Sequence, residues 1–228
     1  MQDQNFNWSI SPRETLKFIP GIITPILYIG LIIILGALEP GYNHLTTMMS
    51  VLGGVEGIRG VIFNIGVALM GILIILFAIV LQKNINEGKG SKIATILFIL
   101  GGLGLIGAAI FHCNQDCTNV IERDITGILH MISAFISGMS LAIAPLFVYF
   151  RLKKDPQWQK YAGYTLATFI ASNIPGITLW VTYLTGNRIR ELEGLIQRLG
   201  IVFVLIWIGV ISVQMLVWNL NISQDVKL

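Results

Sequence analysis

Residues 61–81 read VIFNIGVALMGILIILFAIVL, an apolar run without a single Asp, Glu, Lys or Arg. A helix rises about 1.5 Å per residue, so about 20 apolar residues cross the roughly 30 Å hydrocarbon core of a bilayer. The run therefore predicts a transmembrane helix.

The same pattern occurs five more times in the chain of 228 residues. The full set of runs is Phe18–Leu38, Val61–Leu81, Ile93–Phe111, Ile125–Phe150, Tyr161–Thr185 and Leu199–Leu220. Only short connections remain between them, so we expect one integral membrane domain over residues 1–228. The predicted fold class is all-α, a polytopic bundle of six transmembrane helices whose main partner is the lipid bilayer.

The composition supports this class. Mean hydropathy is +0.76 and charged residues make up 12%, against about 25% in soluble domains. The net charge is +3, and the basic residues are spread over loop ends instead of forming a patch with aromatic residues. A nucleic-acid-binding function is not indicated.

Lys and Arg are unequally divided between the two sides of the bundle, which predicts its orientation. Ten fall on the side of the termini: Arg13, Lys17, Lys83, Lys89, Lys92, Arg151, Lys153, Lys154, Lys160 and Lys227. Five fall on the other side: Arg59, Arg123, Arg188, Arg190 and Arg198. The bias predicts a multi-pass protein of the cell membrane with both termini cytoplasmic, and it places the loops 39–60, 112–124 and 186–198 outside.

The first outer segment is too apolar for a free loop and too rich in glycine for a spanning helix. We expect a short interfacial or re-entrant helix around Asn43–Leu52, after which Gly53 and Gly54 turn the chain.

Gly102-Leu103-Gly104-Leu105-Ile106-Gly107 matches the G-x-G-x-x-G fingerprint, but that motif requires a strand before it and a soluble βαβ unit. Close helix packing is the better interpretation, with Gly104 and Ala108 as a small-xxx-small pair.

In the fourth run, His130, Ser133, Ser137 and Ser140 share one helix face, and Gly138 with Ala142 adds a second small pair. The serine stripe indicates contact between helices, or a narrow polar cavity that leads inwards from His130.

Phe111–His130, FHCNQDCTNVIERDITGILH, is a polar hinge between two apolar runs. Its histidines and carboxylates suggest a divalent metal such as zinc. The candidate metal ligands are His44, His112, His130 and Asp124. His130 is an ionisable group within a spanning run, which marks a functional hypothesis by default. The alternative is that it only ties two helices together through Asp116, Asp124 or a serine.

Cys113 and Cys117 would face an oxidising compartment, where a disulfide is the first interpretation. A labile or metal-binding pair is the alternative.

Four segments together resemble the membrane proteins of the domain-of-unknown-function 998 family, and more distantly the Frag1/DRAM/Sfk1 type. They are YNHLTTMMSVLGG at 42–54, IFHCNQD at 110–116, GILHMISAFISG at 127–138 and GLIQR at 194–198. The resemblance implies six helices and no established activity. It singles out Ser50, the stretch from Phe111 to Asp116, His130, and Gly194-Leu195 with Arg198, although the cysteine pair lengthens the second of these.

The first functional hypothesis is a membrane-embedded hydrolase or transferase that acts on a lipid or another amphipathic substrate. Its expected catalytic residues are His130, Asp116, Ser50 and Arg198: ligand or base, partner, nucleophile and anion clamp. Tyr42, Asn64 and Asn173 are the expected substrate-binding residues.

Three other functions stay open. Asn173 and Pro175 could mark the broken helix of a small-solute transporter. His112 and His130 could bracket a haem or a quinone site. The polar layer could also serve a structural or regulatory protein without catalysis.

Overall fold

The structure is a computed structural model that describes residues 15–85, 89–114, 117, 124–187 and 189–225. The long helices are α2 (Ile19–Leu38), α3 (Ile58–Asn84), α4 (Lys89–Ile110), α6 (Ile125–Leu152), α7 (Ala162–Thr185) and α8 (Glu193–Asp225). Two short 3₁₀ helices join them, η1 (Met49–Gly54) and η3 (Gln159–Tyr161). Six helices in the described part of the chain are long and apolar enough to cross a membrane, as the sequence predicts.

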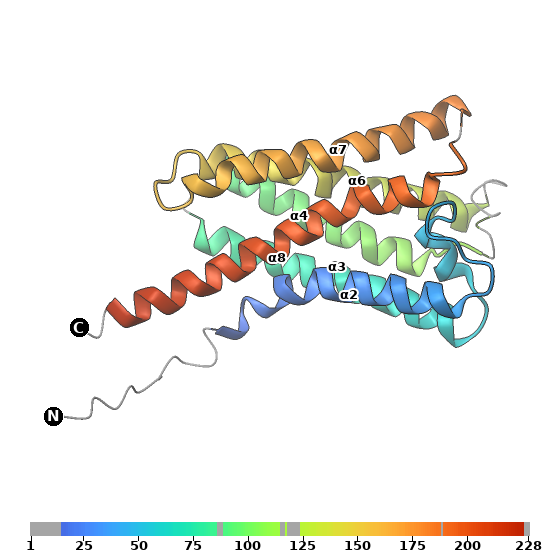
Figure 1. The fold of residues 1–228 in the computed structure, drawn as a ribbon, viewed down its shortest axis with the longest axis horizontal. Helices are drawn as coiled ribbons and strands as arrows, with labels where there is room; N and C mark the ends of the chain where they lie inside the picture. The colour runs from blue at the N-terminus through green and yellow to red at the C-terminus, as the bar shows by residue number, and fades with distance from the viewer. Residues whose placement is uncertain (1–14, 86–88, 115–116, 118–123, 188, 226–228) are drawn as a thin grey trace.

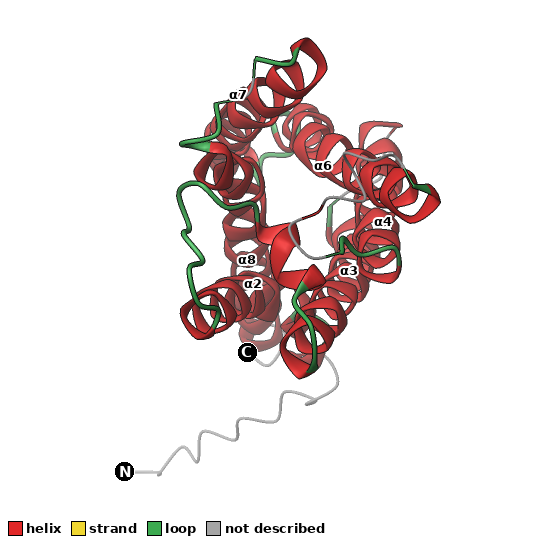
Figure 2. Ribbon diagram, turned by 90° about the vertical axis from the view of Figure 1, so that its right-hand side faces the viewer, coloured by secondary structure: helices red, strands yellow, loops and turns green. Residues whose placement is uncertain are grey.

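The six long helices form a closed ring in which neighbours in sequence are neighbours in space. The order around the ring is α2, α3, α4, α6, α7 and α8, and α8 returns to α2. Because the number of crossings is even, the start of α2 and the end of α8 lie at the same end of the bundle (Figure 1). η1 lies at the opposite end, called the η1 end below, and contacts α2, α3 and α8 across the ring (Figure 2).

The helices extend beyond the apolar runs. α3 covers Ile58–Asn84 and α8 covers Glu193–Asp225, whereas their charge-free runs are 61–81 and 199–220. Backbone hydrogen bonds continue through charged residues at the membrane surface, where water solvates the side chains, so counting apolar residues underestimates helix length.

The short helix after α2 is present but begins later than expected. Turns occupy most of residues 39–47, and the 3₁₀ helix η1 covers Met49–Gly54, so that Gly53 and Gly54 belong to the helix. Gly57 then adopts a φ of 81°, a left-handed value that favours glycine, and α3 begins at the next residue.

The seam between α4 and α6 confirms the packing interpretation of the glycine-rich run. A Cβ added to Gly104 would lie 2.7 Å from the Ser133 carbonyl oxygen, and one added to Gly107 would lie 2.6 Å from Ser133 Oγ. The two backbones therefore approach closely only because these positions are glycine. Gly138, expected to form a second such contact, meets nothing within 4 Å and lines a cavity instead.

Aromatic side chains fill the centre of the ring away from the η1 end. The Phe98 ring stacks on Trp207 at 5.8 Å between centroids, and the Phe77 ring meets both edge-on. Trp207 is fully buried, and its indole nitrogen donates to Thr165 Oγ1 at 2.9 Å. The half of the bundle that contains the chain ends is therefore solidly packed.

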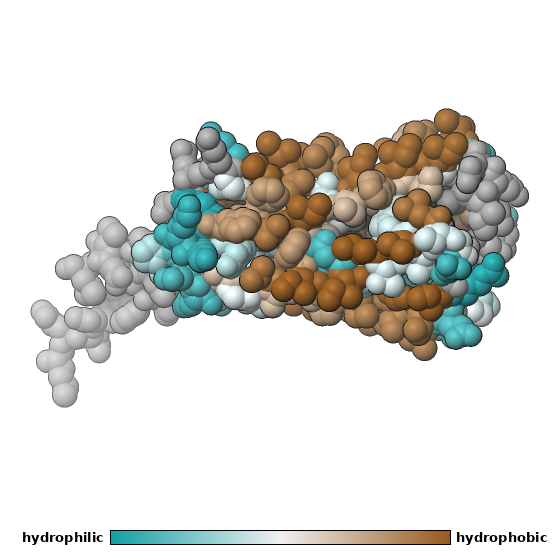
Figure 3. Space-filling view, turned by 90° about the horizontal axis from the view of Figure 1, so that it is seen from above, coloured by the Kyte–Doolittle hydropathy of each residue, from teal (hydrophilic) through white to brown (hydrophobic). Residues whose placement is uncertain are grey.

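The outer surface of the bundle is mainly apolar between two polar ends (Figure 3). Large apolar side chains remain exposed along every long helix, such as Ile26 on α2, Ile65 on α3 and Ile174 on α7, each more than 60% exposed. In a soluble protein such a surface would aggregate, whereas here it faces the hydrocarbon of the bilayer.

Candidate functional site

A cavity of about 160 Å³ lies within the ring in the half nearer the η1 end. It brings together five of the residues predicted from the sequence, which come from η1, α3, the segment that follows α4, α6 and α7. They are Ser50, Asn64, His112, His130 and Asn173. The walls are otherwise mostly apolar, as in most small-molecule sites. Ser50 and His130 also line an adjoining cavity of about 80 Å³.

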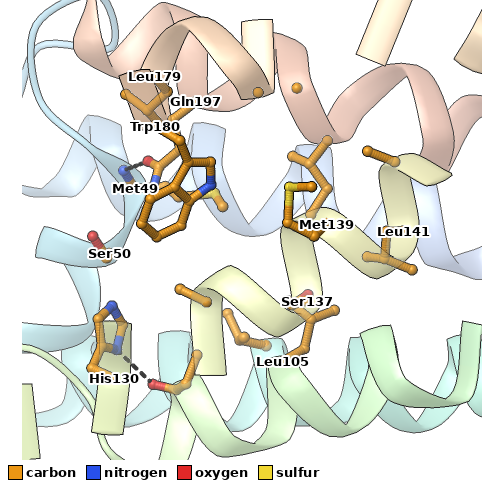
Figure 4. Close-up of a pocket in the computed structure, with 18 of the residues that line it drawn as sticks. Met49, Ser50, Leu105, His130, Ser137, Met139, Leu141, Leu179, Trp180 and Gln197 are labelled. Carbon is orange, nitrogen blue, oxygen red and sulfur yellow. Dashed lines mark hydrogen bonds between the residues drawn. The ribbon is translucent and has the colours of Figure 1, made fainter. Parts of the chain in front are cut away.

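The orientation of His130 is fixed by the backbone of α4. Its Nδ1 lies 3.2 Å from the Ala108 carbonyl oxygen and 3.0 Å from that of Phe111. Because carbonyl oxygens only accept, Nδ1 must carry the proton, and Nε2 of the neutral ring is left with a free lone pair. The ring turns this second nitrogen towards the side of Ser50 (Figure 4). His130 therefore ties α6 to α4, and it also presents a base to the cavity.

Ser50 stands beside the disulfide that joins Cys113 and Cys117, which confirms the predicted pairing. Ser50 Oγ lies 3.6 Å from Cys117 Sγ. Since a disulfide sulfur carries no hydrogen, the hydroxyl is the donor, and sulfur is a weak acceptor. This weak hydrogen bond leaves the Ser50 hydroxyl able to turn to a stronger partner.

Gln197 is a cavity residue that was not predicted from the sequence. Its Oε1 accepts a hydrogen bond from the Met49 backbone nitrogen at 2.6 Å (Figure 4). That contact identifies the oxygen of the amide, so Nε2 is a donor on the other side. Trp180 and Met139 were also missed (Figure 4). Only the position of Gln197 in GLIQR, next to Arg198, could have signalled it.

Both asparagines that line the cavity bind backbone groups. Asn64 Nδ2 donates to the Gly53 carbonyl oxygen at 2.9 Å, which holds η1 against α3. Asn173 Nδ2 donates to the carbonyl oxygens of Ala142 and Phe169 at 2.9 and 2.8 Å, which ties α7 to α6. Each amide still has an oxygen that could accept a hydrogen bond from a bound molecule.

The segment GLIQR docks the chain before η1 onto α8. Gly194 has no side chain, and a Cβ there would lie 2.4 Å from the Thr47 carbonyl oxygen. Arg198 Nη1 donates to the carbonyl oxygens of His44, Thr47 and Gly194 at 2.7, 3.0 and 2.6 Å, and Nη2 donates to the Tyr42 hydroxyl. Arg198 and Tyr42 therefore lie outside the lining of the main cavity, and the guanidinium binds carbonyls in the position where an anion clamp was expected.

Of the four predicted metal ligands, His112 and His130 line the same cavity, whereas His44 and Asp124 are absent from its lining. His44 lies against Gly36 and the Tyr42 ring, and Asp124 caps α6 by accepting from the Gly127 nitrogen at 2.6 Å. Within the described residues, no three His, Cys, Asp or Glu side chains are placed to hold a metal. Asp116 lies outside the described residues, and the metal site stays a prediction.

The guanidinium of Arg198 also affects the ionisation of its neighbours. Burial lowers the pKa of His44, and the nearby positive charge lowers it further. Burial raises the pKa of Tyr42, and Arg198 opposes this shift by charge and by its hydrogen bond. Both groups therefore remain neutral near pH 7.

The fold and its apolar surface define a multi-pass integral membrane protein of six helices. The chain belongs to the family described as protein of unknown function (DUF998), whose model matches residues 22–214. This match confirms the resemblance seen in the sequence. No curated protein and no solved structure matches the chain.

Proposed function

We propose that the protein is a membrane-embedded hydrolase or transferase that acts on an ester-linked lipid. The observation that supports this function best is that Ser50 and His130 together line both the main cavity, whose walls are mostly apolar, and the smaller cavity beside it. A nucleophile, a base and a third group that orients the base are the general elements of covalent acyl transfer. Here two backbone carbonyls take the orienting role.

The chemistry would proceed in two halves. His130 Nε2 takes the proton of Ser50 while Oγ attacks the acyl carbon, and Gln197 Nε2 donates to the oxygen that becomes negative. The bond to the leaving alcohol then breaks, and His130 returns the proton to that alcohol. Water or an acceptor alcohol repeats the sequence on the acyl-serine, which releases the acid or a new ester and restores Ser50.

The charge of the lining favours an acyl group over a phosphoryl group. Among the residues that the structure describes, none that lines the main cavity is Lys, Arg, Asp or Glu. Phosphoryl transfer relies on cations that neutralise the developing charge. The nearby cation, Arg198, is already bound to three carbonyls.

The same proposal includes location and orientation. The bundle would form a single domain in the cell membrane, with both termini cytoplasmic and the cavity in the outer half. The ten-to-five distribution of Lys and Arg supports this. The disulfide at the η1 end supports it independently, because disulfides persist in oxidising compartments.

Ester turnover by protein reconstituted in vesicles tests the function. Ser50→Ala and His130→Gln should each lower the rate by about 10⁴-fold or more, since removal of one member of such a unit disables the whole. Ser133→Ala is the matched control, because Ser133 packs against Gly107 of α4 instead of lining the cavity. Equal rates in Ser50→Ala and Ser133→Ala would exclude Ser50 as the nucleophile.

A second candidate is a structural or regulatory protein without catalysis. Arg198, Asn64, Asn173 and Asp124 all bind backbone groups, and this favours it. It predicts that the Ser50 and His130 variants change only stability. Transport has less support, because α7 is one helix through Pro175 and aromatic rings fill the opposite half of the ring.

A further inference from the structure

Two direct contacts join α6 to α7, one on each side of the positions of Gly138 and Gly176. Towards the η1 end, the rings of Phe135 and Trp180 meet edge-on with centroids 4.9 Å apart. Deeper in the bundle, Asn173 Nδ2 donates to the Ala142 carbonyl oxygen at 2.9 Å. Each pair joins the two antiparallel helices directly.

The two contacts are separated by the same number of residues on α6 and on α7. Seven residues separate Phe135 from Ala142 on α6, and seven separate Asn173 from Trp180 on α7. At about 1.5 Å per residue, the contacts lie roughly 10 Å apart along the helices. They therefore frame a window of about two helical turns on each side.

Glycine occupies the middle of this window on both helices. Gly138 and Gly176 both line the main cavity, and a Cβ added at either position would meet nothing within 4 Å. Gly138 and Ile177, another cavity residue, are also exposed, and each lies about one turn from an exposed apolar residue that does not line the cavity, Phe135 and Ile174 respectively. The same residues thus border the cavity and the lipid-facing surface. On the other side of α6, by contrast, Gly104 is packed tightly against Ser133.

We propose that the window between α6 and α7 is a lateral portal through which one acyl chain enters the cavity from the surrounding bilayer. This inference rests on the proposed function, since it supplies the ester to Ser50 and His130. A chain that lies between Gly138 and Gly176 keeps its methylene groups out of water throughout, so entry has no desolvation cost.

The size of the cavity selects a single chain. Its volume of about 160 Å³ is close to the roughly 150 Å³ of an engineered cavity that holds one benzene ring. A segment of one hydrocarbon chain fits such a space, and two chains side by side do not. The substrate class is therefore an ester lipid that inserts one acyl chain, with its carbonyl at the end of the cavity that holds His130 and Gln197.

Photo-crosslinking tests the portal without requiring turnover. The probe is lysophosphatidylcholine with a diazirine in its acyl chain, added to phosphatidylcholine vesicles that contain the Ser50→Ala protein. After illumination, mass spectrometry maps the adducts. We expect adducts on cavity residues such as Met139 of α6 and Ile201 of α8.

Gly138→Leu should reduce the cavity adducts by at least an order of magnitude, because the new side chain fills the window. Gly30→Leu is the control: Gly30 of α2 also has nothing within 4 Å of its Cβ position, but it lies outside the cavity lining. Gly138→Ala covers the case in which Gly138→Leu impairs folding. Alanine adds only one methyl group, so this variant should lose fewer cavity adducts than Gly138→Leu but more than Gly30→Leu.

Cavity adducts that persist in Gly138→Leu, or adducts confined to the outer surface, would overturn the portal. A different result would refute the proposed chemistry and leave the portal intact. In that result the cavity adducts decrease in Gly138→Leu as expected, but protein with Ser50 intact hydrolyses no ester. The opposite result would refute the portal and leave the chemistry intact. In that result a short soluble ester is hydrolysed only when Ser50 is present, but the cavity adducts are unaltered in Gly138→Leu.

Discussion

Replacing Arg198 with Met should strongly destabilise the η1 end of the bundle. The substitution keeps the apolar stem and removes the group that binds the carbonyl oxygens of His44, Thr47 and Gly194. Hydrogen bonds to charged groups contribute about 1.5–3 kcal/mol each. Arg198 is only half-buried, so water replaces part of the loss, and we expect a cost of roughly 3–4 kcal/mol in the free energy of unfolding.

Thermal unfolding in detergent measures this effect. In a domain of this size each kcal/mol shifts the midpoint by about 2–4 °C, so Arg198→Met should unfold about 10 °C earlier. Arg59→Met is the matched control, because Arg59 binds one carbonyl, that of Leu38, instead of three. Its ion pair with Glu39 at 3.2 Å lies at the surface, and such pairs contribute about 0.2–1 kcal/mol. Equal midpoints for the two variants would refute the docking role. Unchanged stability with lost activity in Arg198→Met would instead support an anion clamp.

Three further outcomes follow from the packing and the charges. Gly104→Ala should lower the free energy of unfolding by about 1–3 kcal/mol, because its Cβ would lie 2.7 Å from the Ser133 carbonyl oxygen. Gly138→Ala should lower it much less in the same assay, because its Cβ meets nothing within 4 Å. Asp124→Ala should lose a helix cap worth about 1 kcal/mol in denaturant unfolding, which Asp124→Asn should largely retain. The lowered pKa of His44 means that the unfolded chain binds the proton first. Stability should therefore be complete above the ordinary pKa of about 6.5 and decline as the pH falls below it. His44→Gln should flatten the decline in a pH series of melting curves, and an unchanged slope would contradict this.

The six helices could be predicted because hydrocarbon imposes its constraint locally. A charge-free run long enough to cross the bilayer identifies its own helix, as Val61–Leu81 does within α3. The position of η1 could not be predicted in this way. The carbonyls of His44 and Thr47 are satisfied by Arg198, which lies more than 150 residues further along the chain. Residues 43–47 therefore form a single turn, closed by the hydrogen bond from the Thr47 nitrogen to the Asn43 carbonyl oxygen at 2.8 Å, instead of a continuing helix.

The candidate site was predicted in part. Ser50, Asn64 and His130 could be placed in one layer because Asn64 and His130 lie near the outer ends of their apolar runs and Ser50 lies in the outer segment 39–60. His44 belongs to that layer in depth but lies against Gly36, and depth alone does not reveal direction around the ring. Gln197 could not be singled out, because its contact with the Met49 backbone depends on the docking of the segment before η1.

Covalent labelling of Ser50 tests the central claim most directly. Vesicle-reconstituted protein treated with a lipid-like fluorophosphonate should carry one adduct, on the peptide that contains Ser50, and His130→Gln should slow its formation while Ser133→Ala should not. Labelling of another serine at the same rate, or labelling of Ser50 that is indifferent to His130→Gln, would contradict a Ser50–His130 pair as the reacting centre.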